Sequence, residues 1–376
     1  MSALKGVHVV ELARVLAGPT TGQTLADLGA DVVKVESPEG DETRRWGPPF
    51  IDTEGEQAAA YFHSCNRGKR SIVADFTTER GREIVRRLAS RADVLIENFK
   101  VGGLKKFGLD YESLKDLNPR LIYCSVTGFG QTGPYAKRAG YDFLIQGMSG
   151  VMDITGEPDG PPEKAGIAIS DLFTGLYGVV AIEAALIARE RSGAGQSIDL
   201  SLFDSMSAML ANQAMNYLAS GRSPKRMGNA HPNLAPYQTL PVADGWLIVA
   251  VGNDGQFARL CRVLELAVDP RFATNPGRVT NRVDMEQALV AKTRLWRRDA
   301  LLDALEKAVV PAGPINTIAD LFADPQFEAR GMQIAPQGVT GIRSPIVMSD
   351  NPLVLERRSP RLNEHQDEIL REIGLV

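Results

Sequence analysis

Short apolar runs rich in β-branched residues alternate with amphipathic helical stretches through the first 130 residues. The apolar runs cover 7–12, 32–36, 93–99 and 121–130. One helix is expected from about Pro19 and another over about 78–91, where Ile84, Val85, Leu88 and Ala89 recur at helical spacing. Strands that alternate with helices in this way predict an α/β fold, with a Rossmann-like parallel sheet covered on both faces.

The loops that leave the carboxyl ends of parallel strands are where α/β sheets bind ligands. In this chain those loops read ARVLAGP, ENFKVGG and TGFGQTGP. The first of them lacks the GxGxxG pattern, which argues against a nicotinamide dinucleotide. We therefore expect a site for another kind of ligand at this edge of the sheet.

The rest of the chain divides into further segments. The small and apolar residues from about 166 to 190 predict a buried helix that ends before SGAGQ, with Gly193 and Gly195 at its exit, and another helix is expected up to about residue 220. A hairpin signal at Asp244-Gly245 opens a second β-rich region. We expect a large domain over 1–220, a linker over 221–233, a smaller α+β domain over 234–315, and a linker and C-terminal return to the large domain over 316–376.

Composition excludes several classes of protein. With 44% hydrophobic and 23% charged residues, the chain resembles ordinary soluble proteins. We find no apolar run of about 20 residues and no export signal at the start, so we expect a cytoplasmic protein without a membrane span. The net charge of −4 and the lack of basic runs argue against nucleic acid. The three cysteines and four histidines lie far apart, which predicts neither disulfides nor a structural metal.

The carboxylate of Asp171 lies between the small-residue run AGIAIS and the helical segment LFTGLYG. A helix N-terminus favours an ionised carboxylate, and Gly175 and Gly178 allow a neighbouring chain to approach closely. An ionised, partly desolvated carboxylate can attack a thioester. The same placement also fits an aspartate that only caps the helix.

A series of segments in a fixed order resembles the class III CoA-transferases of the CaiB/BaiF type, the family of formyl-CoA and carnitine CoA-transferases. These segments are RVLAGP (14–19), DLGADVVKVE (27–36), NRGKRSI (66–72), DVLIENF (93–99), LNPRLIYCSVTGFGQTGP (117–134), AGYDF (139–143), SDLFTG (170–175), GAGQSIDLSL (193–202) and VGNDGQF (251–257). Each alone is weak, but their order and spacing over nearly the whole chain are specific. DETRRWGPPF (41–50), AGYDF and RMGNAHPNLAPYQ (226–238) are most similar to the succinyl-CoA:glutarate CoA-transferase type.

The resemblance implies that Asp171 is the catalytic aspartate, which carries first an anhydride and then a CoA thioester. Tyr141 and Asp142 match positions beside it. The loop of Gly252, Asn253, Asp254 and Gly255 matches the family's mobile loop over the active site, although the sequence alone fits a simple strand-to-helix turn equally well. The family also implies an interlocked homodimer, CoA thioesters as substrates, and no permanently bound cofactor.

For CoA, the resemblance implies contacts from two loops and nearby cations. The matching positions are Val15, Ala17, Asn98, Phe99 and Lys106, with Lys69 and Arg70 as further candidates. Two positions depart from the formyl-CoA enzymes. Ser37 replaces a basic residue, which puts a nucleotide contact in doubt, and Leu16 replaces a glutamine, which argues against formate or oxalate chemistry.

The carboxylate of the acceptor acid needs a positively charged side chain to which no other role has been assigned. We expect Arg14 or Arg44, with His231 as a weaker candidate, because a guanidinium binds a carboxylate in bidentate fashion. Succinate with glutarate is the favoured acid pair, but itaconate, mesaconate, citramalate and related dicarboxylates stay open.

Two other functions remain as alternatives. An α-methylacyl-CoA racemase would share the fold, but racemases have a histidine at the position of Tyr141 and a glutamate at that of Asn253 or Asp254. A tyrosine with a pKa near ~10 is a poor base at neutral pH. A catalytically silent CoA-binding protein is the second alternative, because a fold does not establish an activity.

Overall fold

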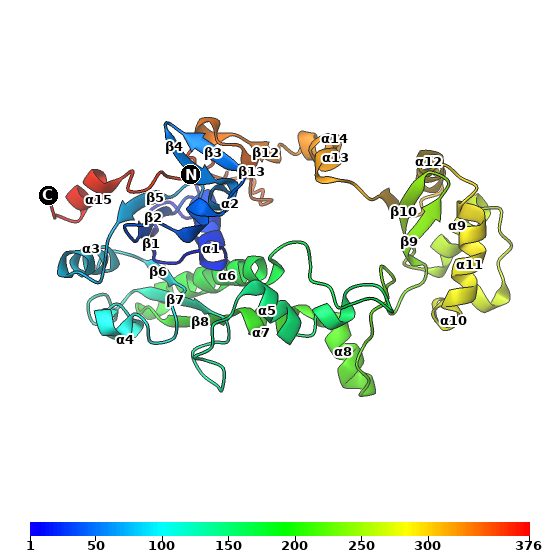
Figure 1. Cartoon of the computed structure of the whole chain (residues 1–376), viewed down its shortest axis with the longest axis horizontal. Coiled ribbons are helices and arrows are strands. Elements are labelled where there is room, and N and C mark those ends of the chain that lie inside the picture. Colours follow the sequence, from blue (N-terminus) through cyan, green and yellow to red (C-terminus); the bar gives the residue numbers. More distant parts are fainter. The chain divides into compact units, whose positions relative to one another are not determined.

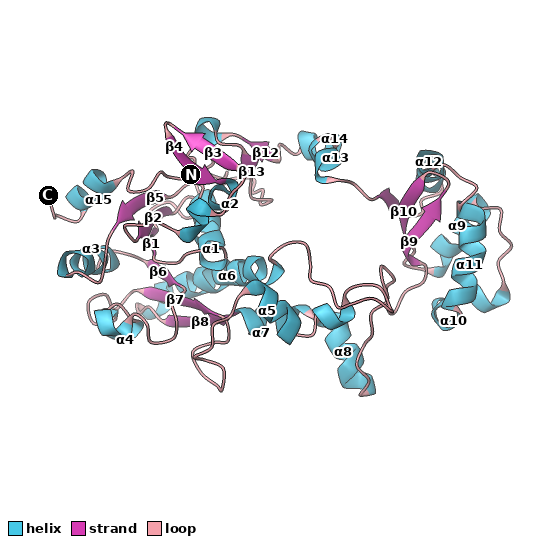
Figure 2. Ribbon diagram, in the orientation of Figure 1, coloured by secondary structure: helices cyan, strands magenta, loops and turns pink.

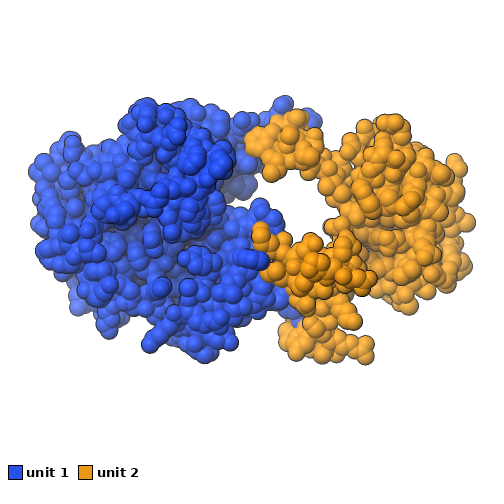
Figure 3. Space-filling view, in the orientation of Figure 1, with its two compact units in different colours: residues 1–151, 165–214, 325–376 blue, residues 152–164, 215–324 orange.

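The computed structural model describes all 376 residues, which form two compact units. Unit 1 consists of 1–151, 165–214 and 325–376, and unit 2 consists of 152–164 and 215–324 (Figure 3). These bounds differ from those of the expected domains, since 152–164, 215–233 and 316–324 group with the smaller unit. Each unit is therefore made of segments that are distant in the sequence.

Unit 1 is built on a six-stranded parallel sheet, as the alternation of strands and helices predicts (Figures 1 and 2). The order across the sheet is β5-β2-β1-β6-β7-β8. These strands are β1 (His8–Glu11), β2 (Asp31–Glu36), β5 (Arg70–Val73), β6 (Val94–Glu97), β7 (Ile122–Thr127) and β8 (Ser197–Ser201). Two small antiparallel pairs complete the strands of the unit, namely β3 (Phe50–Thr53) with β4 (Glu56–Ala59) and β12 (Gln333–Ile334) with β13 (Gly341–Ile342).

Helices lie between and after the strands of unit 1. They are α1 (Ala17–Asp27), α2 (Ala60–Ser64), α3 (Glu79–Ala89), α4 (Tyr111–Leu114), α5 (Asp142–Met148), α6 (Ile169–Ser192), α7 (Leu202–Met209), α14 (Pro325–Ala329) and α15 (Gln366–Glu372). The helix expected up to residue 220 is divided into α7 and α8 (Ala211–Ser220). Ala211 has a φ of 43°, a left-handed backbone that no continuous α-helix contains, so the axis is interrupted there.

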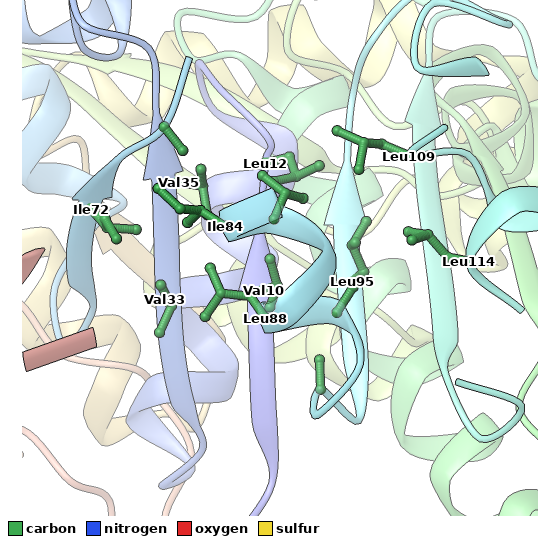
Figure 4. Close-up of a cluster of buried hydrophobic side chains, with 14 of the residues drawn as sticks. Val10, Leu12, Val33, Val35, Ile72, Ile84, Leu88, Leu95, Leu109 and Leu114 are labelled. Carbon is green, nitrogen blue, oxygen red and sulfur yellow. The ribbon is translucent and has the colours of Figure 1, made fainter. Parts of the chain in front are cut away.

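Alternate residues of the central strands face opposite sides of the sheet and supply two separate cores. Val10 and Val33 pack with Ile84 and Leu88 of α3, in the cluster drawn in Figure 4. On the other face, Val9 and Val32, which precede these two valines in the sequence, pack against α1 and α6. Burial on both faces explains why the strands read as continuous apolar runs.

Helices α1 and α6 approach each other closely because α6 carries glycines at the contact. A Cβ at Gly175 would lie 2.8 Å from the carbonyl oxygen of Ala17, and one at Gly178 would lie 2.7 Å from Oγ1 of Thr21. The Thr21 hydroxyl lies between the two helices, 3.2 Å from the carbonyl oxygen of Ala17 and 3.0 Å from that of Gly175. The close approach expected at these two glycines is therefore present, and it joins α1 to α6.

Substituting Gly175 by alanine is expected to destabilise the protein, because the added methyl group must push α6 away from α1. The cost of such overpacking is about 1–3 kcal/mol in the free energy of unfolding. Thermal and urea denaturation would measure this cost. Gly166→Ala is the matched control, since no atom lies within 4 Å of its added Cβ, and an equal loss of stability in both variants would contradict the packing argument.

The helix α6 is long and apolar enough to cross a membrane by length and composition alone, a test that the core helix of a globular protein also passes. Several of its side chains, including Ile182 and Ala185, pack in the core of unit 1. Another set of its apolar side chains is exposed in this single chain: Phe173, Leu176, Tyr177, Val180 and Ile187. The helix expected to be buried is therefore buried on only part of its surface.

Unit 2 contains a three-stranded antiparallel sheet in the order β11-β10-β9. Its strands are β9 (Tyr237–Val242), β10 (Gly245–Ala250) and β11 (Ala312–Pro314). The hairpin predicted at Asp244-Gly245 joins β9 to β10, and Gly245 has the positive φ of 146° that suits glycine. The helices α9 (Asp254–Val263), α10 (Asn275–Thr280), α11 (Arg282–Thr293), α12 (Arg298–Lys307) and α13 (Ile318–Phe322) complete it with the C-terminal part of α8.

Candidate active site

A cavity of about 410 Å³ lies in unit 1, where the loops that follow β1, β6 and β7 meet the start of α6. These loops leave the carboxyl ends of the strands, where the sequence predicts a site. The cavity brings together many of the predicted residues: Arg14, Val15, Ala17, Asn98, Phe99, Lys106, Tyr141 and Asp171.

Asp171 is the third residue of α6, so its carboxylate lies in the first turn of a long helix. Burial, which is the larger cause, and the negative charge of Asp142 together raise the pKa of this carboxyl to about 7. The sequence argument expected the helix N-terminus to favour the ionised form. That expectation of direction is wrong, because desolvation outweighs the helix dipole.

Asp142 fixes the start of α6 from the neighbouring helix α5. One of its carboxylate oxygens accepts hydrogen bonds from the backbone N–H and the hydroxyl of Ser170, at 2.9 and 2.7 Å. Its other oxygen accepts a hydrogen bond from Nε2 of Gln146 at 2.7 Å. These bonds occupy both oxygens of Asp142, so it positions the helix that carries Asp171. Tyr141, the residue before it, is 66% exposed and lines the cavity.

Sequence reasoning missed Tyr61, which lies close enough to Asp171 to respond to its charge. Burial raises the pKa of Tyr61 to about 12, and the charge of Asp171 is the next largest cause. The ring of Tyr61 meets Trp46 edge to face, with 5.3 Å between the ring centroids. Tyr61 lies in α2, directly after the β3–β4 hairpin, outside the segments on which the family resemblance depends.

The turn after β1 and the loop after β6 are held together by paired hydrogen bonds. The Arg14 N–H donates to Oδ1 of Asn98 at 2.9 Å, and Nδ2 of Asn98 donates to the Arg14 carbonyl oxygen at 2.6 Å. The Arg14 guanidinium lies over the ring of Phe99, 5.2 Å from its centroid. Asn98 therefore shapes the cavity, and the side chain of Arg14 is free of any ion pair with this chain's carboxylates.

Lys69 does not reach the cavity. Its side chain is fully buried, and Nζ contacts both carboxylate oxygens of Glu11, at 2.8 and 2.9 Å. The ammonium also donates to the carbonyl oxygen of Pro19 and to Oδ1 of Asn66. With its hydrogen bonds satisfied inside the protein, Lys69 is a structural cation, and its expected role in binding CoA is not supported.

Arg70 and Arg44 are also engaged elsewhere. Arg70 begins β5, at the opposite end of the strand from the loops that line the cavity, and pairs with Asp31, Glu368 and Glu372. Arg44 is buried and pairs with Glu36 at 2.7 Å. Neither guanidinium is available to a substrate, so these two expectations are corrected by position and pairing.

The remaining predicted residues belong to unit 2. Gly252 and Asn253 lie between β10 and α9, Asp254 and Gly255 begin α9, and Asn253 caps this helix by accepting a hydrogen bond from the Gln256 N–H at 2.9 Å. Asp254 pairs with the buried Arg278 at 2.8 Å. His231 stabilises its own turn, where Nδ1 accepts hydrogen bonds from the N–H groups of the two residues 233 and 234. No cluster of three or more His, Cys, Asp or Glu side chains in the chain could hold a metal ion.

Comparison with known proteins identifies the family. The family model described as CoA-transferase family III matches residues 4–366. The chain belongs to this family. The succinate–glutarate CoA-transferase of Agrobacterium fabrum is 60% identical over 99% of this chain and 96% of that protein. The mouse succinyl-CoA:glutarate CoA-transferase is 41% identical over 99% of this chain and 87% of its own length.

A solved structure agrees with this assignment. A CaiB/BaiF family protein from Brucella suis matches with a TM-score of 0.91 and 68% identity, over 99% of both chains. The resemblance noted in the sequence is therefore confirmed, and with it the enzyme class. The chain is a CoA-transferase of family III, and the cavity that contains Asp171 is its candidate active site.

Proposed function

We propose that this CoA-transferase moves CoA from succinyl-CoA to a second dicarboxylic acid, with glutarate as the favoured acceptor and Asp171 as the covalent carrier. The observation that carries the proposal is the position of Asp171, a partly buried carboxylate in the same cavity as the two loops expected to bind CoA. The names of the two relatives compared above support the acid pair.

The proposed reaction begins when a carboxylate oxygen of Asp171 attacks the thioester carbon of succinyl-CoA. The C–S bond breaks, CoA leaves as a thiolate, and a mixed anhydride joins succinate to Asp171. The thiolate then attacks the Asp171 carbonyl carbon, which releases succinate and leaves an aspartyl-CoA thioester. The acceptor carboxylate attacks this thioester, which expels the CoA thiolate and forms a second mixed anhydride. The thiolate then attacks the acyl carbon of the acceptor, which yields the new acyl-CoA and frees the carboxylate of Asp171.

Burial of Asp171 suits such a carrier in two ways. A desolvated carboxylate is a stronger nucleophile than a hydrated one, and anhydride intermediates survive only where water is excluded. Tyr61, which responds to the charge of Asp171, and Tyr141, which lines the cavity, are proposed to contact the reacting acyl group. The family resemblance is the ground for proposing that the glycine-containing loop 252–255 shields the intermediates from water.

We propose a homodimer and a cytoplasmic location for this enzyme. The exposed apolar side chains of α6, among them Leu176 and Val180, support the dimer, since a patch of this kind on a single chain marks an interaction surface. Light scattering tests the dimer directly, and a stable monomer would contradict it.

Incubation with succinyl-CoA and a panel of free acids tests the function. A transferase exchanges CoA between acids, a racemase exchanges the α-proton of an acyl-CoA with solvent, and a silent binding protein does neither. Ranking the acids by kcat/KM then identifies the acceptor, although one methylene group changes binding by only about 1–3 kcal/mol. Glutarate is expected to rank first, and CoA exchange without preference for dicarboxylates would contradict the proposed substrate class.

Arg14→Ala is expected to raise KM for the dicarboxylate about tenfold or more, because the free guanidinium in the cavity is proposed to bind the distal carboxylate. The thermal stability should change little, since Arg14 is exposed. Arg44→Ala is the contrasting variant. It leaves the buried Glu36 without its partner, so it should lower stability by about 3–5 kcal/mol. An unchanged KM in Arg14→Ala would remove Arg14 from the acid site.

A further inference from the structure

A buried network of four charged side chains lies directly beneath the turn that follows β1. Lys34 and Lys69 supply two positive charges, Glu11 and Asp41 supply two negative charges, and the side chains of the two lysines and of Glu11 are fully buried. Nζ of Lys34 lies 3.1 Å from Glu11 and 3.0 Å from Asp41. Burying charges in this way is costly, and apolar residues would often give equal or greater stability.

The network contacts the backbone on both sides of the turn. Lys34 donates to the carbonyl oxygen of Ala13 at 2.9 Å, and Lys69 donates to that of Pro19 at 2.9 Å. Between these two points, the N–H of Val15 points at the carboxylate of Asp41, at 3.3 and 3.5 Å from its two oxygens. The charges therefore hold the end of β1, the middle of the turn and the first turn of α1.

Val15 needs such support because its backbone is left-handed, with a φ of 72°. A β-branched residue strongly disfavours this conformation, which persists only where the surroundings impose it. Asp41 is well placed to impose it, since Oδ1 also accepts hydrogen bonds from the N–H and the hydroxyl of Thr43, at 3.0 and 2.8 Å. The charge of Lys34 and these hydrogen bonds keep the pKa of Asp41 below its usual value, despite burial.

We propose that Asp41, supported by Lys34, is a positioning residue that holds Val15 in its left-handed conformation and so presents residues 14–17 to the CoA thioester. This inference rests on the proposal that the turn binds CoA. The inference goes beyond that proposal because it assigns a function to the buried charged side chains. It also explains why Lys69, which sequence reasoning placed at the ligand, lies beneath the turn instead.

A double-mutant cycle between Asp41→Asn and Val15→Gly tests the proposal, because glycine adopts a positive φ without help. With Val15 in place, Asp41→Asn should weaken binding of free CoA, measured by calorimetry, and lower kcat/KM for succinyl-CoA, each by about tenfold or more. In the Val15→Gly background the same substitution should cost less than about threefold. Equal losses in both backgrounds would overturn the proposal. If the role of Asp41 were merely structural, Asp41→Asn would have the same effect with valine or glycine at position 15.

Thr43→Val is the second variant, for the case in which Asp41→Asn does not fold. It removes the hydroxyl donor to Asp41 but keeps all four charges, and its smaller loss of CoA affinity should also disappear in the Val15→Gly background. Glu39→Gln is the matched control, because Glu39 is an exposed acid in the same loop and its loss should leave CoA binding unchanged. A loss in Thr43→Val that persists when it is combined with Val15→Gly would also count against the proposal.

Amide hydrogen exchange separates this inference from the proposed function, because it requires no activity. Exchange of the Val15 N–H should be slow in the unaltered chain and faster in Thr43→Val and Asp41→Asn, while the neighbouring strand β2 stays protected. If the protein failed to transfer CoA but showed this pattern, only the function would be in error. If the protein transferred CoA but the Val15 N–H exchanged freely, the proposed role of Asp41 would be wrong and the proposed function would stand.

Discussion

Asp171→Ala is expected to lower the rate of CoA transfer by at least about a thousandfold, since the covalent carrier is removed and no neighbouring group can replace it. Asp142 is close enough for its charge to act on Asp171, but its two oxygens are occupied by Ser170 and Gln146. The rate of CoA exchange between succinyl-CoA and glutarate measures the effect. In the unaltered enzyme, mass spectrometry during turnover should find residue 171 carrying CoA.

Glu190→Gln is the matched control for this variant. Glu190 lies near the C-terminal end of the same helix, and its side chain is 72% exposed, so its loss should leave the rate unchanged. Circular dichroism should show that both variants keep their fold. Full activity in Asp171→Ala, or the lack of any modification at residue 171, would contradict the proposed mechanism.

The pH dependence of the reaction is the second large effect that we expect. The nucleophile must be ionised, and the pKa of Asp171 in the free enzyme is raised to about 7. Above this pH the carboxylate is present and kcat/KM should be constant. As the pH falls through 7, the group takes up a proton, and kcat/KM should decrease about tenfold per pH unit. Steady-state rates from about pH 5 to about pH 9 measure this profile.

Asp142→Asn tests the cause of the raised pKa. The amide oxygen can still accept a hydrogen bond from Ser170, while the negative charge that raises the pKa of Asp171 is gone. The acidic limb of the profile should therefore move to lower pH, but only in part, because burial is the larger cause. A limb that stays in place would show that Asp142 acts through structure alone, and a flat profile down to about pH 5 would contradict a buried nucleophile.

The parallel sheet and the position of Asp171 could be predicted from the sequence because both depend on local patterns. Runs such as 32–36 have the composition of a strand covered on both faces, and Asp171 precedes an apolar helical segment. The family resemblance then identified the loops around Asn98 and Val15. These features can be recognised from the order of residues along the chain alone.

The roles of the cations could not be predicted in the same way, because they depend on partners that are distant in the sequence. Lys69 and Glu11 are 58 residues apart, and nothing local distinguishes a lysine that pairs inside the protein from one that faces a phosphate. The position of Tyr61 near Asp171 presents the same difficulty. The raised pKa of Asp171 could not be predicted either, because its main cause is burial in a cavity lined by residues that are distant in the sequence.

The contact between α1 and α6 restricts how this enzyme can change its choice of acid. The turn at 14–17 leads into α1, Asp171 begins α6, and the two helices touch through Gly175, Gly178 and Thr21. Glycine has no side chain that a substitution could shorten. Substitutions at Gly175 and Gly178 therefore cannot bring α1 and α6 closer together, and so cannot shorten the distance between Asp171 and the thioester. New acid preferences must therefore arise from side chains that line the cavity, such as Arg14 and Arg138.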